Sequence, residues 1–268
     1  MSRISLIFKR LRQQNRKALI PYIMAGDPSL EDTERFVSEI EEAGADIIEL
    51  GVPFTDPLAD GPTIQRAHER ALSKGITLKK VLPLIEGIRQ RTDIPIVVMT
   101  YYNPVFKYGI EAFIKEAVRV GVDGVIIPDL IPDEAGDLIR IARGHGLDTI
   151  FLLAPTSTNE RIGKIVKAST GFIYYVSITG ITGARLLTND LMRNTLRLIQ
   201  ENTNKPIAIG FGISNPEEAA EVSKLADGVI VGSAIVRLIA EGKDIKDFVK
   251  SIREAVVSLG EHIGGANT

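Results

Sequence analysis

Short runs of apolar, mostly β-branched residues recur along the chain at intervals of roughly 20 to 50 residues. Most of these runs are apolar at consecutive positions and do not alternate with polar residues. This pattern is typical of parallel strands that are buried between two layers. The eight predicted strands cover residues 19–25, 46–50, 95–101, 124–128, 148–153, 171–177, 206–211 and 228–231.

Amphipathic segments separate the strands. The predicted helices include residues 31–43, 78–90, 110–118, 133–143, 159–168, 189–201 and 215–225. Their start signals are Ser29, Pro132-Asp133, Thr158 and Asn215. Strand–helix alternation repeated eight times predicts an α/β fold, a closed (β/α)8 TIM barrel. A doubly wound open sheet is the alternative, but residues 26–29 after the first strand lack its G-x-G-x-x-G fingerprint.

Two helical segments exceed the plain barrel plan, one at residues 1–14 and one within residues 63–90. The first is a basic amphipathic helix, and we expect it to cover the mouth of the barrel at which the strands begin. Its apolar positions are Ile4, Leu6, Ile7, Phe8 and Leu11. Composition does not change abruptly along the chain, so residues 1–268 are predicted to form a single domain.

Composition narrows the possible functions. A formal net charge of -2 argues against a nucleic-acid-binding surface, and the absence of cysteine excludes disulfides and thiolate metal sites. The N-terminal segment lacks the apolar core of a signal peptide, and no apolar run has the length of a membrane span. We therefore expect a cytoplasmic protein that does not bind membranes.

A carboxylate stands inside the second predicted strand. Glu49 lies in an apolar run that breaks at Gly51 and Pro53 into a loop carrying Asp60. In a TIM barrel, functional groups lie where strands end, so both carboxylates are candidates for the site. A buried carboxylate usually has a raised pKa. The alternative is that Glu49 faces solvent or pairs with a lysine.

Glycines mark the ends of the last two strands. Residues 209–214 read Ile-Gly-Phe-Gly-Ile-Ser, and residues 231–234 read Val-Gly-Ser-Ala directly before a helix. The loops after strands seven and eight commonly bind phosphate in such barrels, and the amides of Gly232 and Ser233 would point at the anion. The alternative is two tight turns that need glycine for conformational reasons alone.

Two other kinds of chemistry are disfavoured. A Schiff-base lysine should stand inside the barrel, yet no predicted strand contains one, and a metal site needs clustered ligands. The nearest lysines precede strands or lie in a loop, and the histidines are scattered: Lys17, Lys107, Lys205, His68, His145 and His262. Proton transfer by carboxylates, with a phosphate anchor, is the chemistry that is left.

Several motifs resemble those of a known family. Residues 49–65 are similar to the signature of the tryptophan synthase alpha subunit family, and so are residues 21–28, 101–105, 128–130, 154–156 and 180–184. The resemblance implies cleavage of indole-3-glycerol phosphate to indole and glyceraldehyde 3-phosphate. It also implies an alpha2beta2 complex with a beta subunit that receives the indole. No cofactor is expected in this chain, because pyridoxal phosphate belongs to the beta subunit.

The resemblance also implies residue roles. Glu49 matches the general acid–base and Asp60 the carboxylate that stabilises the indole N–H, while Thr182 matches a loop threonine that orients Asp60. The predicted phosphate ligands are Gly183, Gly212, Gly232 and Ser233. Residues expected to pack beside the indole ring are Tyr22, Tyr174 and Phe211. Residues expected to face the beta subunit are Asp56 and Asn103.

Three alternatives remain open at this stage. The chain could be a barrel that binds a partner without turnover, or a lyase that works alone. A phosphosugar isomerase of the same fold would need a histidine or lysine electrophile at a strand end, and the sequence offers none there.

Overall fold

The computed structural model describes residues 1–176, 190–210 and 212–257. Within them, nine parallel strands form one sheet in the order β5-β4-β3-β2-β1-β9-β8-β7-β6, which curls into a nearly closed barrel. The strands are β1 (Ala18–Met24), β2 (Ile48–Gly51), β3 (Ile96–Met99), β4 (Gly124–Ile126), β5 (Asp148–Ile150), β6 (Leu152–Leu153), β7 (Ile173–Val176), β8 (Ile207–Gly210) and β9 (Gly228–Val231). The predicted barrel and its parallel strands are confirmed.

The fifth predicted strand, residues 148–153, is not continuous. Its first half, β5, pairs with β4, and its second half, β6, pairs with β7. The strands of a barrel are staggered, so one strand can meet its two neighbours at different heights. Between β5 and β6 the ring of strands is therefore continued by the peptide backbone at Phe151.

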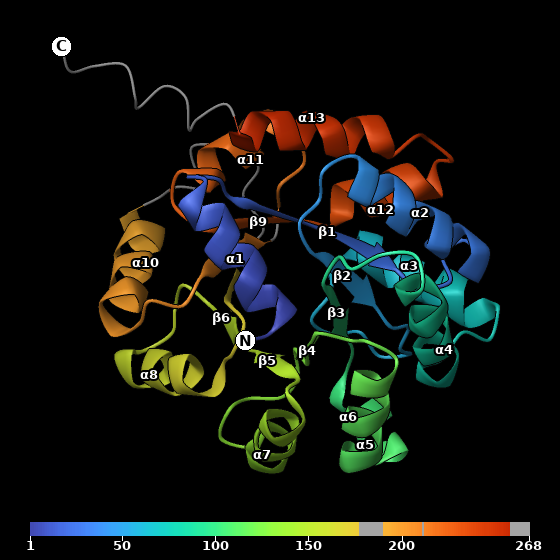
Figure 1. Ribbon diagram of the computed structural model, residues 1–268, viewed down its shortest axis with the longest axis horizontal. Coiled ribbons are helices and arrows are strands. Elements are labelled where there is room, and N and C mark those ends of the chain that lie inside the picture. The colour runs from blue at the N-terminus through green and yellow to red at the C-terminus, as the bar shows by residue number, and fades with distance from the viewer. Residues whose placement is uncertain (177–189, 211, 258–268) are drawn as a thin grey trace.

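Helices surround the strands as an outer layer (Figure 1). Those in the described residues are α1 (Arg3–Gln13), α2 (Leu30–Glu42), α3 (Pro62–Ser73), α4 (Leu78–Arg89), α5 (Tyr102–Tyr108), α6 (Ile110–Arg119), α7 (Gly136–His145), α8 (Asn159–Ala168), α10 (Asp190–Asn202), α11 (Pro216–Ser223), α12 (Ser233–Ala240) and α13 (Lys246–Val257). The longer helices are amphipathic because each packs a stripe of apolar residues against the sheet and exposes its polar side to solvent.

Most predicted helix starts are confirmed. The side chains of Ser29, Thr158 and Asn215 each accept a hydrogen bond from an amide of the first turn. Two predictions were wrong. Helix α7 begins at Gly136, after a turn that contains Pro132, and Lys107 lies in the short helix α5 and not in a loop.

Helix α1 crosses the mouth of the barrel at which the strands begin (Figure 1). Its residues Ile4, Phe8 and Leu11 are buried on the side that faces the barrel. Burying each of these side chains contributes about 1.5–3 kcal/mol to the stability of the fold. The Phe8 ring lies 5.8 Å from that of Phe172, which directly precedes β7. Leu6, predicted as part of the apolar face, is 52% exposed, because it lies on the opposite side of the helix.

Carboxylates at the strand starts tie neighbouring strands together. Each accepts a hydrogen bond from an amide at the start of the preceding strand: Asp46 from Leu19 (2.9 Å), Asp123 from Ile96 (2.9 Å) and Asp227 from Ile207 (3.0 Å). An arginine lies beside each carboxylate, namely Arg253, Arg89 and Arg12, in that order. These contacts stabilise the end of the barrel at which the strands begin, opposite their carboxyl ends.

Candidate active site

A cavity of about 380 Å³ opens at the carboxyl ends of the strands. Its lining includes the two candidate carboxylates, two of the predicted ring-packing residues and three of the predicted phosphate ligands, but no lysine among the described residues. The predicted residues that line it are Tyr22, Glu49, Asp60, Tyr174, Gly212, Gly232 and Ser233. The structure thus brings together residues that are spread over most of the chain.

Glu49 is fully enclosed by the barrel. It pairs in register with Tyr22 of β1 and is 1% exposed, and neither carboxyl oxygen has a hydrogen-bond partner within the described residues. Burial, and then the charge of Asp60, raise the pKa of Glu49 to about 8. The alternative in which Glu49 faces solvent or pairs with a lysine is wrong. Its carboxyl group is a neutral acid at pH values below about 8.

Asp60 lies in the loop that joins β2 to α3, and its side chain is 5% exposed. The Tyr101 hydroxyl donates a hydrogen bond to Oδ2 of Asp60 at 2.8 Å, and Nε2 of His68 lies 3.1 Å from the same oxygen. The side-chain amide of Gln65 donates to the backbone carbonyl of Asp60 at 2.9 Å. The carboxylate of Asp60 is therefore held by polar contacts, whereas the described residues offer no hydrogen bond to the carboxyl group of Glu49.

The rings of Tyr22 and Tyr174 lie inside the barrel, each packed against a glycine of a neighbouring strand. A Cβ atom at Gly51 would lie 2.2 Å from the Tyr22 hydroxyl oxygen, and one at Gly210 would lie 2.5 Å from that of Tyr174. Any larger residue would displace the rings, so glycine at these two strand ends makes room for the tyrosines. Burial raises the pKa of both tyrosines well above their usual value, which keeps the hydroxyls neutral.

The opposite wall of the cavity suits an anion. Gly212 has a φ of 81°, in the left-handed region that favours glycine. Gly232 is the N-cap of α12, and within the described chain no side chain caps this helix end. The first amides of α12, at Ser233 and beyond, are therefore available to a ligand, with the helix dipole behind them.

Three predicted site residues, Thr182, Gly183 and Phe211, lie outside the described residues. The two predicted partner-facing residues, Asp56 and Asn103, are both exposed. Asp56 lies in the loop after β2, and Asn103 lies in α5, which follows β3. Both segments follow the carboxyl ends of strands and lie at the end of the barrel that bears the cavity.

Two residues that contact Asp60, His68 and Tyr101, were not predicted as site residues. His68 lies in a helix, as expected, but its side chain is only 3% exposed and reaches Asp60. The apolar spacing of α3 gives a usable signal, because Ile64, Ala67 and Ala71 lie on the same buried face as His68. A histidine on a buried helix face directly after a loop with a carboxylate is a candidate site residue.

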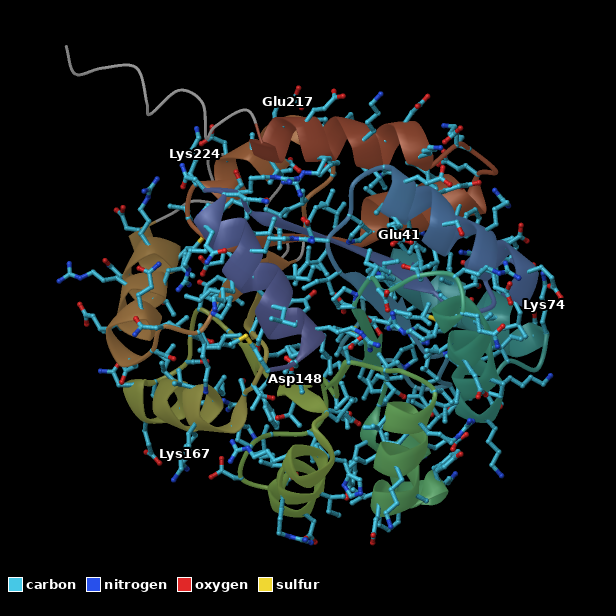
Figure 2. The ribbon with its side chains drawn as sticks, in the orientation of Figure 1. Glu41, Lys74, Asp148, Lys167, Glu217 and Lys224 are labelled. Carbon is cyan, nitrogen blue, oxygen red and sulfur yellow. The ribbon has the colours of Figure 1, made fainter. Side chains whose placement is uncertain are left out.

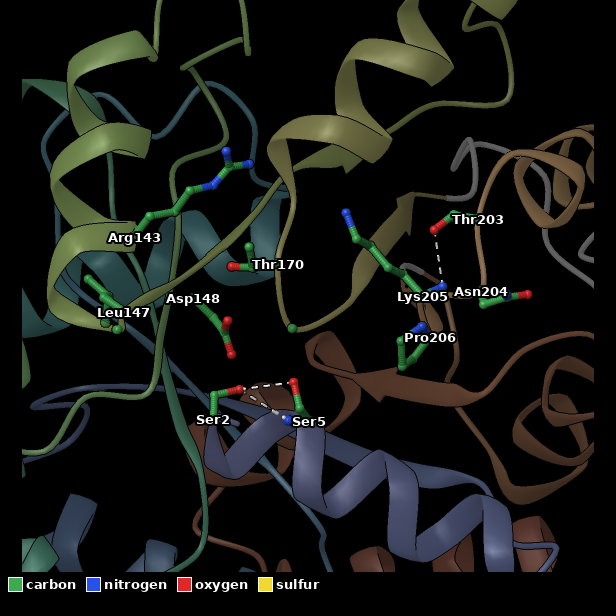
Figure 3. A pocket seen from close by; sticks show the side chains of 12 residues that line it. Ser2, Ser5, Arg143, Leu147, Asp148, Thr170, Thr203, Asn204, Lys205 and Pro206 are labelled. Carbon is green, nitrogen blue, oxygen red and sulfur yellow. Dashed lines mark hydrogen bonds between the residues drawn. The ribbon is translucent and has the colours of Figure 1, made fainter.

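A second cavity, of about 630 Å³, lies at the opposite end of the barrel, beside the first residues of α1 (Figure 3). Ser2 and Ser5 line it together with Asp148, which Figure 2 places near the centre of that face. Lys205 also lines it, but its ammonium donates to the carbonyls of Val166 and Ser169. None of the candidate site residues lies there. In the described part of the chain, no three histidine, aspartate or glutamate side chains are grouped to hold a metal ion.

Comparison with known proteins agrees with this geometry. The sequence model of the family described as tryptophan synthase alpha chain matches residues 8–263. The chain belongs to the tryptophan synthase alpha chain family. The tryptophan synthase alpha chain of Geotalea uraniireducens is 51% identical over 97% of this chain and 100% of its own length.

Solved structures of tryptophan synthase share the fold. The alpha subunit of Legionella pneumophila is 37% identical, with a TM-score of 0.88 over 96% of this chain and 99% of its own. A chain of tryptophan synthase from Mycobacterium tuberculosis is 39% identical, with a TM-score of 0.89 over 95% of this chain and 98% of its own.

The expected family, the TIM barrel with its N-terminal helix and the expected function are confirmed. The chain is a tryptophan-biosynthetic lyase that cleaves indole-3-glycerol phosphate, and membership of the tryptophan synthase alpha chain family implies a beta-subunit partner. Among the helices of the described ranges, none combines the length and the apolar character needed to cross a membrane.

Proposed function

We propose that Glu49 and Asp60 carry out the cleavage of indole-3-glycerol phosphate, with Glu49 as the general acid–base and Asp60 as the carboxylate that stabilises the indole N–H. The observation that carries this proposal is the state of Glu49. It is buried, without a hydrogen-bond partner in the described residues, and its pKa is about 8. A carboxyl group of this kind holds a proton near neutral pH and can donate it.

In the first step, Glu49 protonates C3 of the indole ring, and positive charge develops at the ring nitrogen. The carboxylate of Asp60, which lines the same cavity, stabilises this charge through the N–H. The bond between C3 and the glycerol carbon then breaks, and its electron pair returns to the ring. The hydroxyl on that carbon gives its proton to Glu49 and becomes the aldehyde, so that Glu49 ends the cycle protonated.

The phosphate group of the substrate is proposed to bind at the start of α12. The amides of Gly232 and Ser233 would donate to it, and Gly212 lets the neighbouring loop approach closely. Tyr22 and Tyr174 are proposed to pack beside the indole ring. The roles of Thr182 and Gly183 in closing the phosphate side, and of Phe211 beside the ring, stay predictions from the sequence.

The proposed surface for the beta subunit surrounds the mouth of the cavity. Asp56 and Asn103 are exposed there, and two apolar side chains beside them face solvent, Leu58 at 90% and Phe106 at 63% exposure. Large exposed apolar side chains in two segments at the same end of the barrel are typical of a protein interface. An alpha2beta2 complex is proposed, in which pyridoxal phosphate is bound by the beta subunit and this chain binds no cofactor.

We further propose that residues 1–268 act as a single domain in the cytoplasm, without binding nucleic acid. The net charge of -2 supports the last point. A single cooperative unfolding transition, seen by both circular dichroism and fluorescence, is the expected result for one domain.

The test of the catalytic roles is indole release by the Glu49→Gln and Asp60→Asn variants, with and without a beta subunit. Both variants should lose turnover by at least about a thousandfold while still binding glycerol phosphate like the wild type. Turnover within tenfold of wild type in either variant would remove that residue from the mechanism. Loss of glycerol phosphate binding would mean that the substitution has damaged the cavity, and the Gly212→Ala variant then reports the phosphate site separately.

A further inference from the structure

Two side chains bind the same oxygen of Asp60, and each is itself oriented by the backbone of the loop that carries Asp60. The amide of Phe54 donates to Nδ1 of His68 at 2.9 Å, and the amide of Ala59 donates to the Tyr101 hydroxyl oxygen at 3.1 Å. Nε2 of His68 and the hydroxyl of Tyr101 then face Oδ2 of Asp60, at 3.1 Å and 2.8 Å. Two hydrogen-bond chains thus start and end within the loop.

The first chain determines the protonation of His68. Because Nδ1 accepts a hydrogen bond from the Phe54 amide, Nδ1 has no proton of its own. A neutral imidazole then carries its proton on Nε2, where it can only be donated to Asp60. In an imidazolium, Nδ1 would also carry a proton, and this N–H would point at the N–H of Phe54. Because His68 is only 3% exposed, the ring has little room to turn away from this clash.

The same logic applies to Tyr101. Its oxygen accepts from Ala59, and its proton goes to Asp60. The ring is fixed by stacking on Phe54, with centroids 5.1 Å apart, and by an edge contact with His68 at 6.2 Å. Both donors bind Oδ2, and the described residues donate no hydrogen bond to Oδ1. Among the described residues, Oδ1 is therefore left without a donor and faces a substrate in the cavity.

We propose that His68 is a positioning residue which, as the neutral Nε2–H tautomer and together with Tyr101, holds Oδ2 of Asp60 so that Oδ1 receives the indole N–H. This inference rests on the proposed function, because it needs Asp60 to contact the ring nitrogen. His68 is not among the residues that line the cavity. It acts by fixing the carboxylate, so its contribution should appear in the transition state, when charge develops at the indole nitrogen.

The kinetic test compares His68→Leu, His68→Gln and Tyr101→Phe with a control on the same helix, Glu69→Gln, whose side chain is exposed. Losing one hydrogen bond to a charged group should lower kcat about 10- to 100-fold in His68→Leu and Tyr101→Phe. The Kd for glycerol phosphate should stay within about twofold of wild type, because the phosphate site is at α12. Glu69→Gln should behave as wild type.

His68→Gln tests the hydrogen-bonding pattern itself. A glutamine amide offers one acceptor and one donor, as the neutral imidazole does, so this variant should recover most of the activity that His68→Leu loses. Recovery to within about fivefold of wild type supports the proposal. A glutamine variant as slow as the leucine variant, or a leucine variant with the wild-type kcat, would overturn it.

A spectroscopic test reads the protonation of His68 in the wild-type protein. The chain has three histidines, so the ring nitrogens of His68 can be assigned in ¹⁵N-histidine-labelled protein by their loss in His68→Gln. We expect a protonated Nε2 and an unprotonated Nδ1 near neutral pH, and the Nδ1–H tautomer or an imidazolium there would refute the inference. If Asp60→Asn retains turnover, the proposed role of Asp60 fails. If Asp60→Asn is inactive and His68→Leu is fully active, the inference alone fails.

Discussion

Replacing Glu49 by glutamine should change how the stability of the protein depends on pH. The side chain is fully buried, and its pKa rises from an ordinary value of 4.5 to about 8. At about 1.36 kcal/mol per pH unit, this difference corresponds to about 5 kcal/mol between the two protonation states. Glutamine keeps the size and shape of a protonated glutamate but has no proton to lose.

The sign follows from proton binding. Between about pH 4.5 and pH 8 the native protein holds a proton on Glu49 that the unfolded chain has released. Raising the pH across this window therefore lowers the free energy of unfolding by about 1.4 kcal/mol per pH unit. The contribution is fully present below pH 4.5 and is lost as the pH rises through about 8. Glu49→Gln lacks this dependence.

The assay is urea unfolding of the wild type and of Glu49→Gln at about pH 6 and about pH 7.5. In going from the lower to the higher pH, the stability of the wild type relative to the variant should fall by about 2 kcal/mol. Groups such as Asp46, whose pKa is raised by burial, contribute equally to both proteins and cancel in the comparison.

A difference between the two proteins that stays constant across this range would refute the reasoning, because it would mean that Glu49 titrates alike in the folded and unfolded chains. The Glu69→Gln variant is the control for removing a carboxylate, since this residue is exposed on α3.

Three further predictions concern the walls of the cavity and the base of the barrel. Gly51→Ala should push the Tyr22 ring into the cavity and raise KM for indole-3-glycerol phosphate at least about tenfold, which steady-state kinetics will show. Gly212→Ala forces an alanine to a φ of 81°, at a cost of about 1–2 kcal/mol, and should weaken glycerol phosphate binding measured by calorimetry. Asp46→Asn leaves Arg253 buried without its charge partner and should lower the free energy of unfolding by about 3 kcal/mol with kcat unchanged. Adding Arg253→Met should restore much of that stability in urea titrations.

The sequence was most informative where one physical requirement dominates a position. An apolar run predicts a buried strand, and a glutamate inside it is so costly that it indicates a functional group, as Glu49 does. Glycines before a helix start predict an anion site, as is proposed at Gly232. These are local signals, and the barrel then brings the strand ends together whatever the intervening residues are.

The sequence was least informative where contacts depend on the path of a loop. His68 and Tyr101 lie 8 and 41 residues beyond Asp60, and nothing in their local pattern fixes the distance to it. The start of α7 was predicted too early for a related reason. A proline and an acidic residue favour a helix start, but here they form a turn, and the first helical residue is Gly136.

The interruption of the fifth strand determines where new chain termini could be introduced by circular permutation. The Phe151 amide donates to the Ser169 hydroxyl at 3.3 Å and not to the backbone of a neighbouring strand. Its carbonyl accepts from the Tyr174 amide of β7 at 3.3 Å, so Phe151 is paired laterally with β7 alone, and the peptide backbone joins it to β5. A circular permutant with new termini at Phe151 would expose β5 and β6 as two free sheet edges, which invite pairing with other chains. New termini between α3 and α4 would leave the ring of strands uncut.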